Sequence, residues 1–195
     1  MRTTPIAIAR SLSIFGHPLV VVPIAVVTLV LYGRTSSPAL IVSVVCGIAG
    51  VVLAFSFWQV RRGHWQHVDA SARAERRSLN LFLAIVLFLG AAVAFYQLPE
   101  PGLSLGLLLS GLLIVAVMLV SPWVKLSLHA SFAAFAVLLL WPLNLWYVAL
   151  ASVTAVGICW SRVVLARHTV VEVLGGSLLG GFFGACFWLA LRAHG

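Results

Sequence analysis

The stretch Leu79–Leu98 reads LNLFLAIVLFLGAAVAFYQL, and no charged side chain interrupts it. A helix that crosses the hydrocarbon core of a bilayer needs about 20 residues of this kind. The whole chain has the same character, since 63% of its 195 residues are hydrophobic and 8% are charged. A soluble domain is nearer ~45–50% apolar and ~25% charged. This composition cannot build a water-facing shell, so it predicts an integral membrane protein.

Apolar segments of this kind recur along the chain and predict an all-α, polytopic transmembrane bundle. They form a single integral membrane domain, residues 1–195, with six to seven spans. The fifth segment is short for a span, so six spans plus a re-entrant piece is the alternative. The run Leu12–Tyr32 is too long for the ~7–15 residues of a signal peptide's apolar region, so we interpret it as a retained first helix. The seven segments are Phe15–Tyr32, Leu40–Trp58, Leu79–Leu98, Leu103–Val120, Leu128–Trp141, Leu143–Trp160 and Val170–Leu191.

A long polar loop, residues 59–78, contains a cluster of arginines. Asp69 or Ser71 is suited to cap a short helix that runs into the third span. On such a helix the spacing i, i+4, i+7, i+8 places four side chains on one face. These are Asp69, Arg73, Arg76 and Arg77. We therefore expect several guanidinium groups to point toward a common place.

The net charge of +8 is concentrated in the connections between apolar segments. In a membrane protein this pattern indicates positive-inside anchoring or an anionic lipid ligand, and it does not call for nucleic acid as a partner. With seven spans, ten of the twelve basic residues share one side with the N-terminus and only Arg34 and Arg192 lie opposite. We expect the crowded side to be cytoplasmic, in a bacterial-type inner membrane. The ten are Arg2, Arg10, Arg61, Arg62, Arg73, Arg76, Arg77, Lys125, Arg162 and Arg167.

Three ionisable residues lie near the start of the last apolar segment: Arg162, His168 and Glu172. Charged groups at membrane depth are costly and mark functional sites by default. Glu172 follows His168 by four residues, so on a helix its carboxylate can reach the imidazole and make the other ring nitrogen a better nucleophile. Arg162 can bind phosphoryl oxygens in a bidentate fork. The alternative is structural, with the arginines anchoring an interface and Glu172 pairing with one of them.

A second polar cluster, Lys125–Ala130, opens the fifth segment on the same predicted side. A lone histidine such as His129 is commonly an interfacial residue. Its convergence with His168, Arg162 and the arginine face changes that interpretation. Two imidazoles and several guanidinium groups suit phosphoryl transfer without a metal, one imidazole attacking phosphorus and the other protonating the leaving oxygen. No cofactor is implied.

The run Ser161–Glu172 resembles the third motif, S-R-x5-H-x3-D, of the type 2 phosphatidic acid phosphatase superfamily, which includes the vanadium-dependent haloperoxidases. Serine, arginine and histidine match in register, and Glu172 replaces the aspartate. The second motif, P-S-G-H, corresponds to residues 126–129, where serine and histidine remain. The first motif, K-x6-R-P, aligns best with Asp69–Arg77 and keeps its arginine. The resemblance places the first motif in residues 59–78 and the other two in residues 125–172.

The resemblance implies a phosphatase-type helical core and a role for each matching residue. His168 would be the nucleophile that forms a phosphohistidine, His129 the acid and then the base, and Glu172 the group that orients His168. Leu128 replaces the motif's glycine, and Lys125 or Arg73 would supply the charge of the missing lysine. The expected phosphate-binding residues are Arg162, Arg76, Arg77, Lys125, Ser127, Leu128 and Arg73.

These residues favour a metal-independent phosphatase acting on a phosphorylated membrane lipid, such as phosphatidic acid, phosphatidylglycerophosphate or an isoprenyl phosphate or diphosphate. The alternative is a relative with degenerate catalytic motifs, which binds or moves a lipid phosphate without hydrolysing it. A haem protein with His129 and His168 as axial ligands is a third class, in which Arg162 and Glu172 would have no role. The sequence does not specify the lipid or the oligomeric state.

Two further features concern packing. Gly176, Gly180 and Gly184 recur every four residues, which predicts close packing of the last helix against a neighbour. His17-Pro18 interrupts the first apolar run and is interpreted as a kink or cap. The three cysteines are scattered in apolar runs and predict neither a disulfide framework nor a metal cluster.

Overall fold

The computed structural model describes residues 3–33, 37–66, 72–98 and 100–193. Within these ranges the chain forms eight α-helices and no β-strand, as the all-α prediction requires. The helices are α1 (Thr3–Phe15), α2 (Pro18–Tyr32), α3 (Pro38–Arg61), α4 (Arg73–Gln97), α5 (Pro101–Val120), α6 (Leu128–Leu139), α7 (Leu145–Val164) and α8 (Val170–Ala193).

Among the described residues, five helices are long and apolar enough to cross a membrane: α3, α4, α5, α7 and α8. Large apolar side chains cover their outward faces, for example Phe95 on α4 and Leu189 on α8. A soluble protein would not expose apolar surface on this scale. The chain is therefore an integral membrane protein, and its described residues form five helices that could span the membrane, or six if α1 and α2 together form one.

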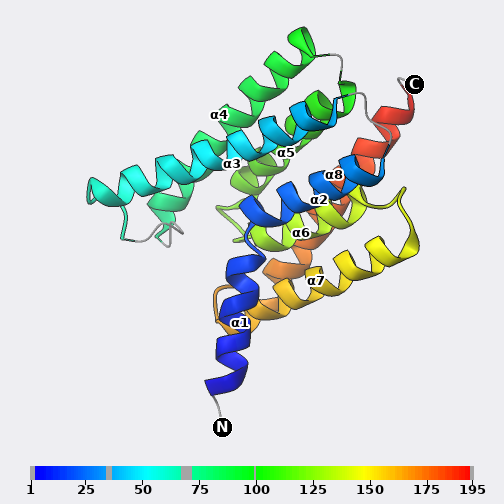
Figure 1. Ribbon diagram of the computed structural model, residues 1–195. Coiled ribbons are helices and arrows are strands. Elements are labelled where there is room, and N and C mark those ends of the chain that lie inside the picture. The colour runs from blue at the N-terminus through cyan, green and yellow to red at the C-terminus, as the bar shows by residue number, and fades with distance from the viewer. Residues whose placement is uncertain (1–2, 34–36, 67–71, 99, 194–195) are drawn as a thin grey trace.

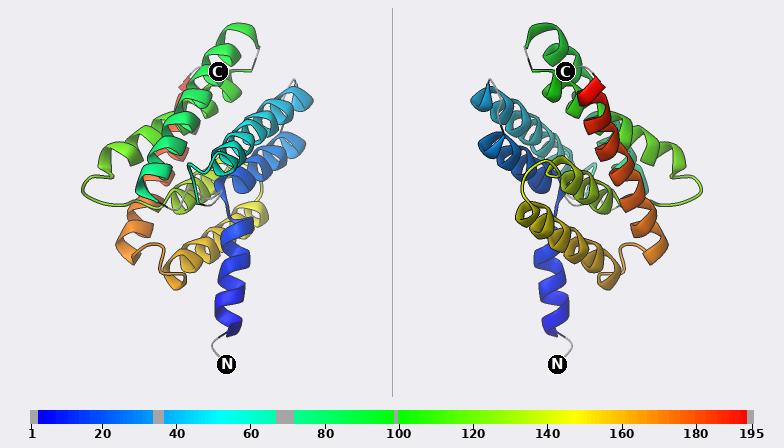
Figure 2. Two further views of the ribbon diagram at one scale, coloured as in Figure 1. Left: turned by 90° about the vertical axis from the view of Figure 1, so that its left-hand side faces the viewer. Right: turned by 90° about the vertical axis from the view of Figure 1, so that its right-hand side faces the viewer.

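The expectation of six to seven spans is confirmed only in part, because two of the expected segments are not single long helices and the count of five or six agrees best with the six-span alternative. The fifth apolar segment forms α6, whose 12 residues extend only about 18 Å at ~1.5 Å per residue, too short for a ~30 Å hydrocarbon core. The first apolar run is not one helix either, because α1 and α2 meet at an angle of 60°. Figure 2 shows α1 projecting away from the other helices.

The break between α1 and α2 follows from the local sequence. Pro18 has no N–H to continue a helix but fits the first position of a new one. His17 caps that new helix, because its Nδ1 accepts a hydrogen bond from the Leu19 N–H at 3.2 Å. Gly16 allows close packing at the bend, since a Cβ there would collide with the Ile158 side chain of α7. The expected kink or cap at His17-Pro18 is confirmed.

The short helix α6 lies at the centre of the bundle, in contact with α2, α7 and α8 (Figure 1). Most of its residues are buried, including His129, Phe132 and Phe135. A helix that is apolar and buried on nearly every side belongs to the core of a protein. Its amino-terminal end therefore carries His129 into the interior of the molecule.

The glycine ridge of α8 packs against α6, as its spacing predicts. A Cβ on Gly176 would lie 2.7 Å from the Ser127 carbonyl oxygen, and one on Gly180 would collide with the Ser131 backbone. At the far end of the same seam, the Trp188 indole N–H donates to the Leu138 carbonyl oxygen at 2.7 Å. This close contact fixes the position of α6 relative to α8, and so of His129 relative to the start of α8.

Candidate active site

A polar cavity of about 1070 Å³ lies where four of the described helices begin: α2, α4, α6 and α8. A helix amino terminus carries a partial positive charge and directs backbone N–H groups outward. Four such ends around one cavity favour an anion. Basic side chains from the same cavity wall add to this field: Arg73, Arg76, Arg77, Lys125, Arg162 and Arg167.

His168 lies in the connection between α7 and α8, and its ring orientation is fixed by two acceptors. Its Nδ1 is 2.9 Å from Glu172 Oε2 and 3.1 Å from the Lys125 carbonyl oxygen. Both partners can only accept, so Nδ1 carries the proton and donates to them. The lone pair is then on Nε2, which is the nucleophilic nitrogen.

Glu172 is held in place by the start of α8. Its Oε2 also accepts from the Thr169 N–H at 3.2 Å, and its own N–H donates to Thr169 Oγ1 at 3.3 Å. This reciprocal pair is a capping box, which satisfies two backbone N–H groups of the first turn. The carboxylate therefore has a structural role at the helix end and an orienting role toward His168.

The turn between α7 and α8 brings Arg162 and His168 to the same wall of the cavity. The N–H groups of Arg167 and His168 both donate to the Arg162 carbonyl oxygen, at 3.0 and 3.2 Å. Ala166 has φ 51°, a left-handed conformation that costs a residue with a Cβ about 1–2 kcal/mol. The contacts around the turn maintain this conformation.

Arg162 is 7% exposed and extends from the last turn of α7. One terminal nitrogen, Nη1, donates to the Ser13 hydroxyl of α1 at 2.6 Å. A planar guanidinium group fixed in this way presents its remaining donors in a set direction, as recognition of a phosphoryl group requires. The first helix thus contributes to the site by orienting Arg162.

His129 is 8% exposed and occupies the first turn of α6. Its ring lies edge-to-face with the ring of His17, with centroids 5.1 Å apart and an interplanar angle of 88°. His17 accepts the Leu19 N–H on Nδ1, so in the neutral ring Nε2 carries the proton. The bend between α1 and α2 therefore places a third histidine beside the two that the sequence singled out.

The pKa values of Lys125 and His168 are both lowered in this cavity. Burial lowers the pKa of Lys125, and the guanidinium of Arg76 lowers it further. The Lys125 ammonium donates to the Arg167 carbonyl oxygen at 3.0 Å. Burial also lowers the pKa of His168, while the hydrogen bond to Glu172 opposes this shift. His168 is thereby favoured in the neutral form that a nucleophile needs.

The structure brings nearly all of the expected site residues to this one cavity. Its lining residues include His168, His129, Glu172, Arg162, Arg76, Arg77, Lys125, Leu128 and Arg73. The expected cap from Asp69 or Ser71 lies outside the described residues, and α4 begins at Arg73 after Ala72. Glu75 accepts the Ala72 N–H at 3.0 Å instead.

Ser127 is placed differently from the expectation. It is fully buried and does not line the cavity. Its N–H donates to the Glu172 carbonyl oxygen at 3.2 Å, and its hydroxyl accepts the Ala130 N–H at 3.4 Å. The N–H thus joins α6 to α8 and the hydroxyl caps α6, so this geometry does not support the phosphate contact expected of Ser127.

Two site residues were missed by reasoning from the sequence. Ser13 showed no pattern that distinguished it from other small residues of a membrane helix. His17 did show such a pattern, because a histidine before a proline marks a break in an apolar run. A helix break at a polar residue can bring that residue close to polar side chains of other helices. Within the described part of the chain, no group of three or more His, Cys, Asp or Glu residues is arranged to hold a metal ion.

No protein-family model, no curated protein and no solved structure matches this chain. The motif resemblance of residues 161–172 therefore stays a prediction, as does the phosphatase-type core.

Proposed function

We propose that the protein is a membrane-embedded, metal-independent phosphatase that hydrolyses a phosphomonoester or diphosphate of a membrane lipid through a phosphohistidine. The observation that carries the proposal is the hydrogen bonding of His168. Glu172 and the Lys125 carbonyl hold its proton on Nδ1, which leaves Nε2 unprotonated in a cavity lined by arginines. This is the arrangement of a nucleophile, an orienting carboxylate and an anion-binding wall.

The reaction proceeds in two displacements. In the first, His168 Nε2 forms a bond to phosphorus while the bond from phosphorus to the lipid oxygen breaks, and a protonated His129 gives its proton to that oxygen. In the second, water attacks the phosphohistidine, neutral His129 takes a proton from the water, and the P–N bond breaks to release phosphate. Arg162 and the arginines of α4 stabilise the charge on the equatorial oxygens.

One observation favours a second function, in which the protein binds a lipid phosphate without hydrolysing it. Leu128 lines the cavity at the start of α6, where the resemblance expects a glycine that lets the backbone approach phosphate. A leucine side chain here narrows the approach to the α6 backbone. Vanadate or lipid phosphate binding without phosphate release would support this alternative over the phosphatase.

The test is phosphate release from a lipid phosphate panel in EDTA, with wild type, His168→Ala and His64→Ala. His64 is exposed, lies after α3 and does not line the cavity, so it is a matched control for the same substitution. We expect wild type and His64→Ala to release phosphate at similar rates and His168→Ala to lose activity. Full activity of His168→Ala would refute the mechanism.

We further propose that the cavity faces the cytoplasm, because basic side chains from α4, Lys125 and the turn after α7 gather at its end of the bundle. Helix α8 begins at the cavity and is long enough to cross the membrane. Alkaline phosphatase fused to the carboxyl terminus should then be active. Green fluorescent protein fused to the same end should not fluoresce. The reverse pattern would invert the orientation.

A further inference from the structure

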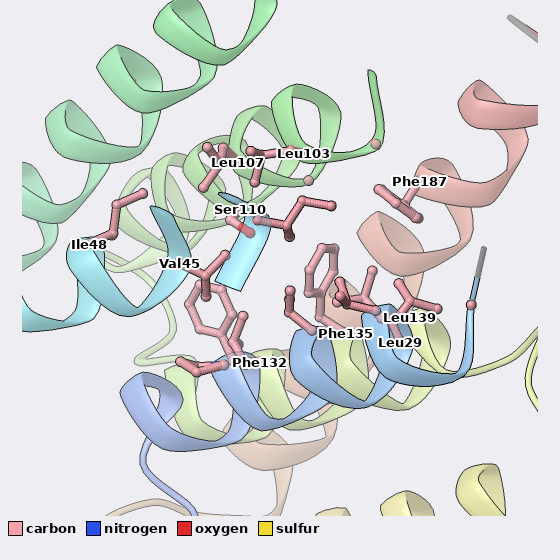
Figure 3. Close-up of a pocket in the computed structure, with 18 of the residues that line it drawn as sticks. Leu29, Val45, Ile48, Leu103, Leu107, Ser110, Phe132, Phe135, Leu139 and Phe187 are labelled. Atoms are coloured by element: carbon pink, nitrogen blue, oxygen red, sulfur yellow. The ribbon is translucent and has the colours of Figure 1, made fainter. Parts of the chain in front are cut away.

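A second cavity, of about 460 Å³, lies between α2, α3, α5, α6 and α8, and α4 adds Leu83 and Leu87 to its wall. Figure 3 shows apolar side chains around it from the first five of these helices, with Ser110 as a polar exception among the labelled residues. Its volume lies within the ~300–1,000 Å³ of small-molecule sites. The proposed chemistry does not use this cavity.

The apolar cavity adjoins the polar one. Four residues line both: Pro18, Leu19, Leu83 and Phe132. From this junction the apolar cavity follows α2 from Pro18 at its start to Tyr32 at its end. Fifteen helical residues extend about 22 Å, and the hydrocarbon of one bilayer leaflet is about 15 Å deep. The cavity is thus long enough for an extended lipid chain that starts at the polar site.

We propose that the apolar cavity binds a single hydrocarbon chain of the lipid whose phosphate lies in the polar cavity. The inference rests on the proposed function for the phosphate end only. A molecule that fills both cavities must carry an anionic group and an apolar chain on neighbouring atoms, which describes a lipid phosphate. The substrate class is therefore a phosphate or diphosphate with one long chain, saturated or isoprenoid.

One chain fits better than two. The volume lies toward the lower end of the range for ligand sites, and six helices line the cavity. The chain leaves one apolar environment, the bilayer, for another, so it gains little from water exclusion. Its contribution is positional, because a chain fixed between helices holds the phosphate ester at His168.

A pair of identical substitutions on α3 tests the chain site. Val45 lines the apolar cavity, whereas Val51 lies outside both cavities and is 50% exposed. Val45→Phe should lower kcat/KM for hexadecyl phosphate about tenfold, because an added ring overfills the space that the chain occupies. Both variants should leave kcat/KM for butyl phosphate within about twofold of wild type. An equal loss on both substrates, or an equal effect of Val51→Phe, would overturn the chain site.

A crosslinking experiment on the wild-type protein tests the chain site independently. Its result does not depend on catalytic turnover or on the folding of a variant. The probe is hexadecyl phosphonate with a diazirine in mid-chain, and its crosslinks are mapped by mass spectrometry. We expect labelling of cavity residues such as Val45 and Leu107, suppressed by hexadecyl phosphate. Labelling confined to lipid-facing residues such as Val51 and Leu108 would overturn the proposal.

The same experiment separates the two proposals. Cavity labelling in a protein that releases no phosphate would sustain the chain site and refute hydrolysis. Phosphate release without cavity labelling would sustain hydrolysis and refute the chain site. Stronger competition by dipalmitoyl phosphatidic acid than by hexadecyl phosphate would refute the restriction to one chain.

Discussion

Replacing Glu172 by glutamine tests whether this residue orients His168. The substitution keeps the size of the side chain and an oxygen that can cap α8, but it removes the negative charge. Nδ1 of His168 loses a charge-assisted bond of 2.9 Å and keeps its bond to the Lys125 carbonyl at 3.1 Å. The proton therefore stays on Nδ1, and Nε2 stays the nucleophile.

The structure sets the size of the effect. A hydrogen bond to a charged group contributes about 1.5–3 kcal/mol, which corresponds to about 10- to 150-fold in kcat/KM at ~1.4 kcal/mol per tenfold. If Glu172 alone determined the tautomer, a glutamine amide could donate to Nδ1 and place the proton on Nε2. Inversion of the tautomer in a comparable triad costs about 10⁴-fold. The second acceptor on Nδ1 predicts the smaller loss.

The assay is phosphate release by purified protein in detergent, over a range of hexadecyl phosphate concentrations, with the melting temperature of each variant. Glu172→Ala is the companion variant, since it also removes the cap on the Thr169 N–H and should cost about 1 kcal/mol of stability. A 10⁴-fold loss of kcat/KM in Glu172→Gln would refute the orienting role of the Lys125 carbonyl. An unchanged kcat/KM would refute the orienting role of Glu172.

Three further predictions follow from the same geometry. Neutral His168 is the reactive form and burial lowers its pKa below 6.5, so the acid-side fall of kcat/KM should have a midpoint below 6.5, and an acid-side midpoint above 6.5 would contradict this. On the alkaline side kcat/KM should fall as His129, the general acid, loses its proton. Gly180→Val should lower the melting temperature by about 5 °C or more, because the added side chain overpacks against α6. Gly181→Val is the control and should not lower it, because a Cβ added there meets nothing within 4 Å. Equal melting temperatures of the two variants would count against close packing of α8 on α6. His17→Ala should lower kcat by about 2- to 13-fold by removing the ring that supports His129, as expected for an aromatic pair of ~0.5–1.5 kcal/mol, and His64→Ala, measured in parallel, should match wild type.

The membrane class, the helical architecture and most of the cavity's ionisable residues could be predicted from the sequence. Long apolar runs force helices, because backbone groups in lipid must be satisfied within the segment. The motif spacing selected Arg162, His168 and Glu172 directly. Counting sides across the apolar segments then brought His129 and the α4 arginines to the same end, and the structure places them around one cavity.

The errors have a common physical cause, which is that apolarity alone does not report length or continuity of a helix. The fifth segment is as apolar as its neighbours, yet α6 ends at Leu139 and lies in the protein core. The run Leu12–Tyr32 is apolar apart from a few polar residues, and at one of them, His17, the chain bends by 60°. The motif position of Ser127 likewise did not report that its N–H joins α6 to α8.

The sequence by itself singled out the residues that we propose carry the chemistry, because charged side chains in an apolar chain are few and their spacing restricts what they can reach. Only the tertiary structure decided how they are oriented. The proton position on His168 depends on the Lys125 carbonyl, 43 residues away in the chain, and the position of Arg162 depends on Ser13, 149 residues away. Contacts at such separations arise only when helices pack, and no local pattern encodes them. The same holds for the apolar cavity, whose walls come from six helices.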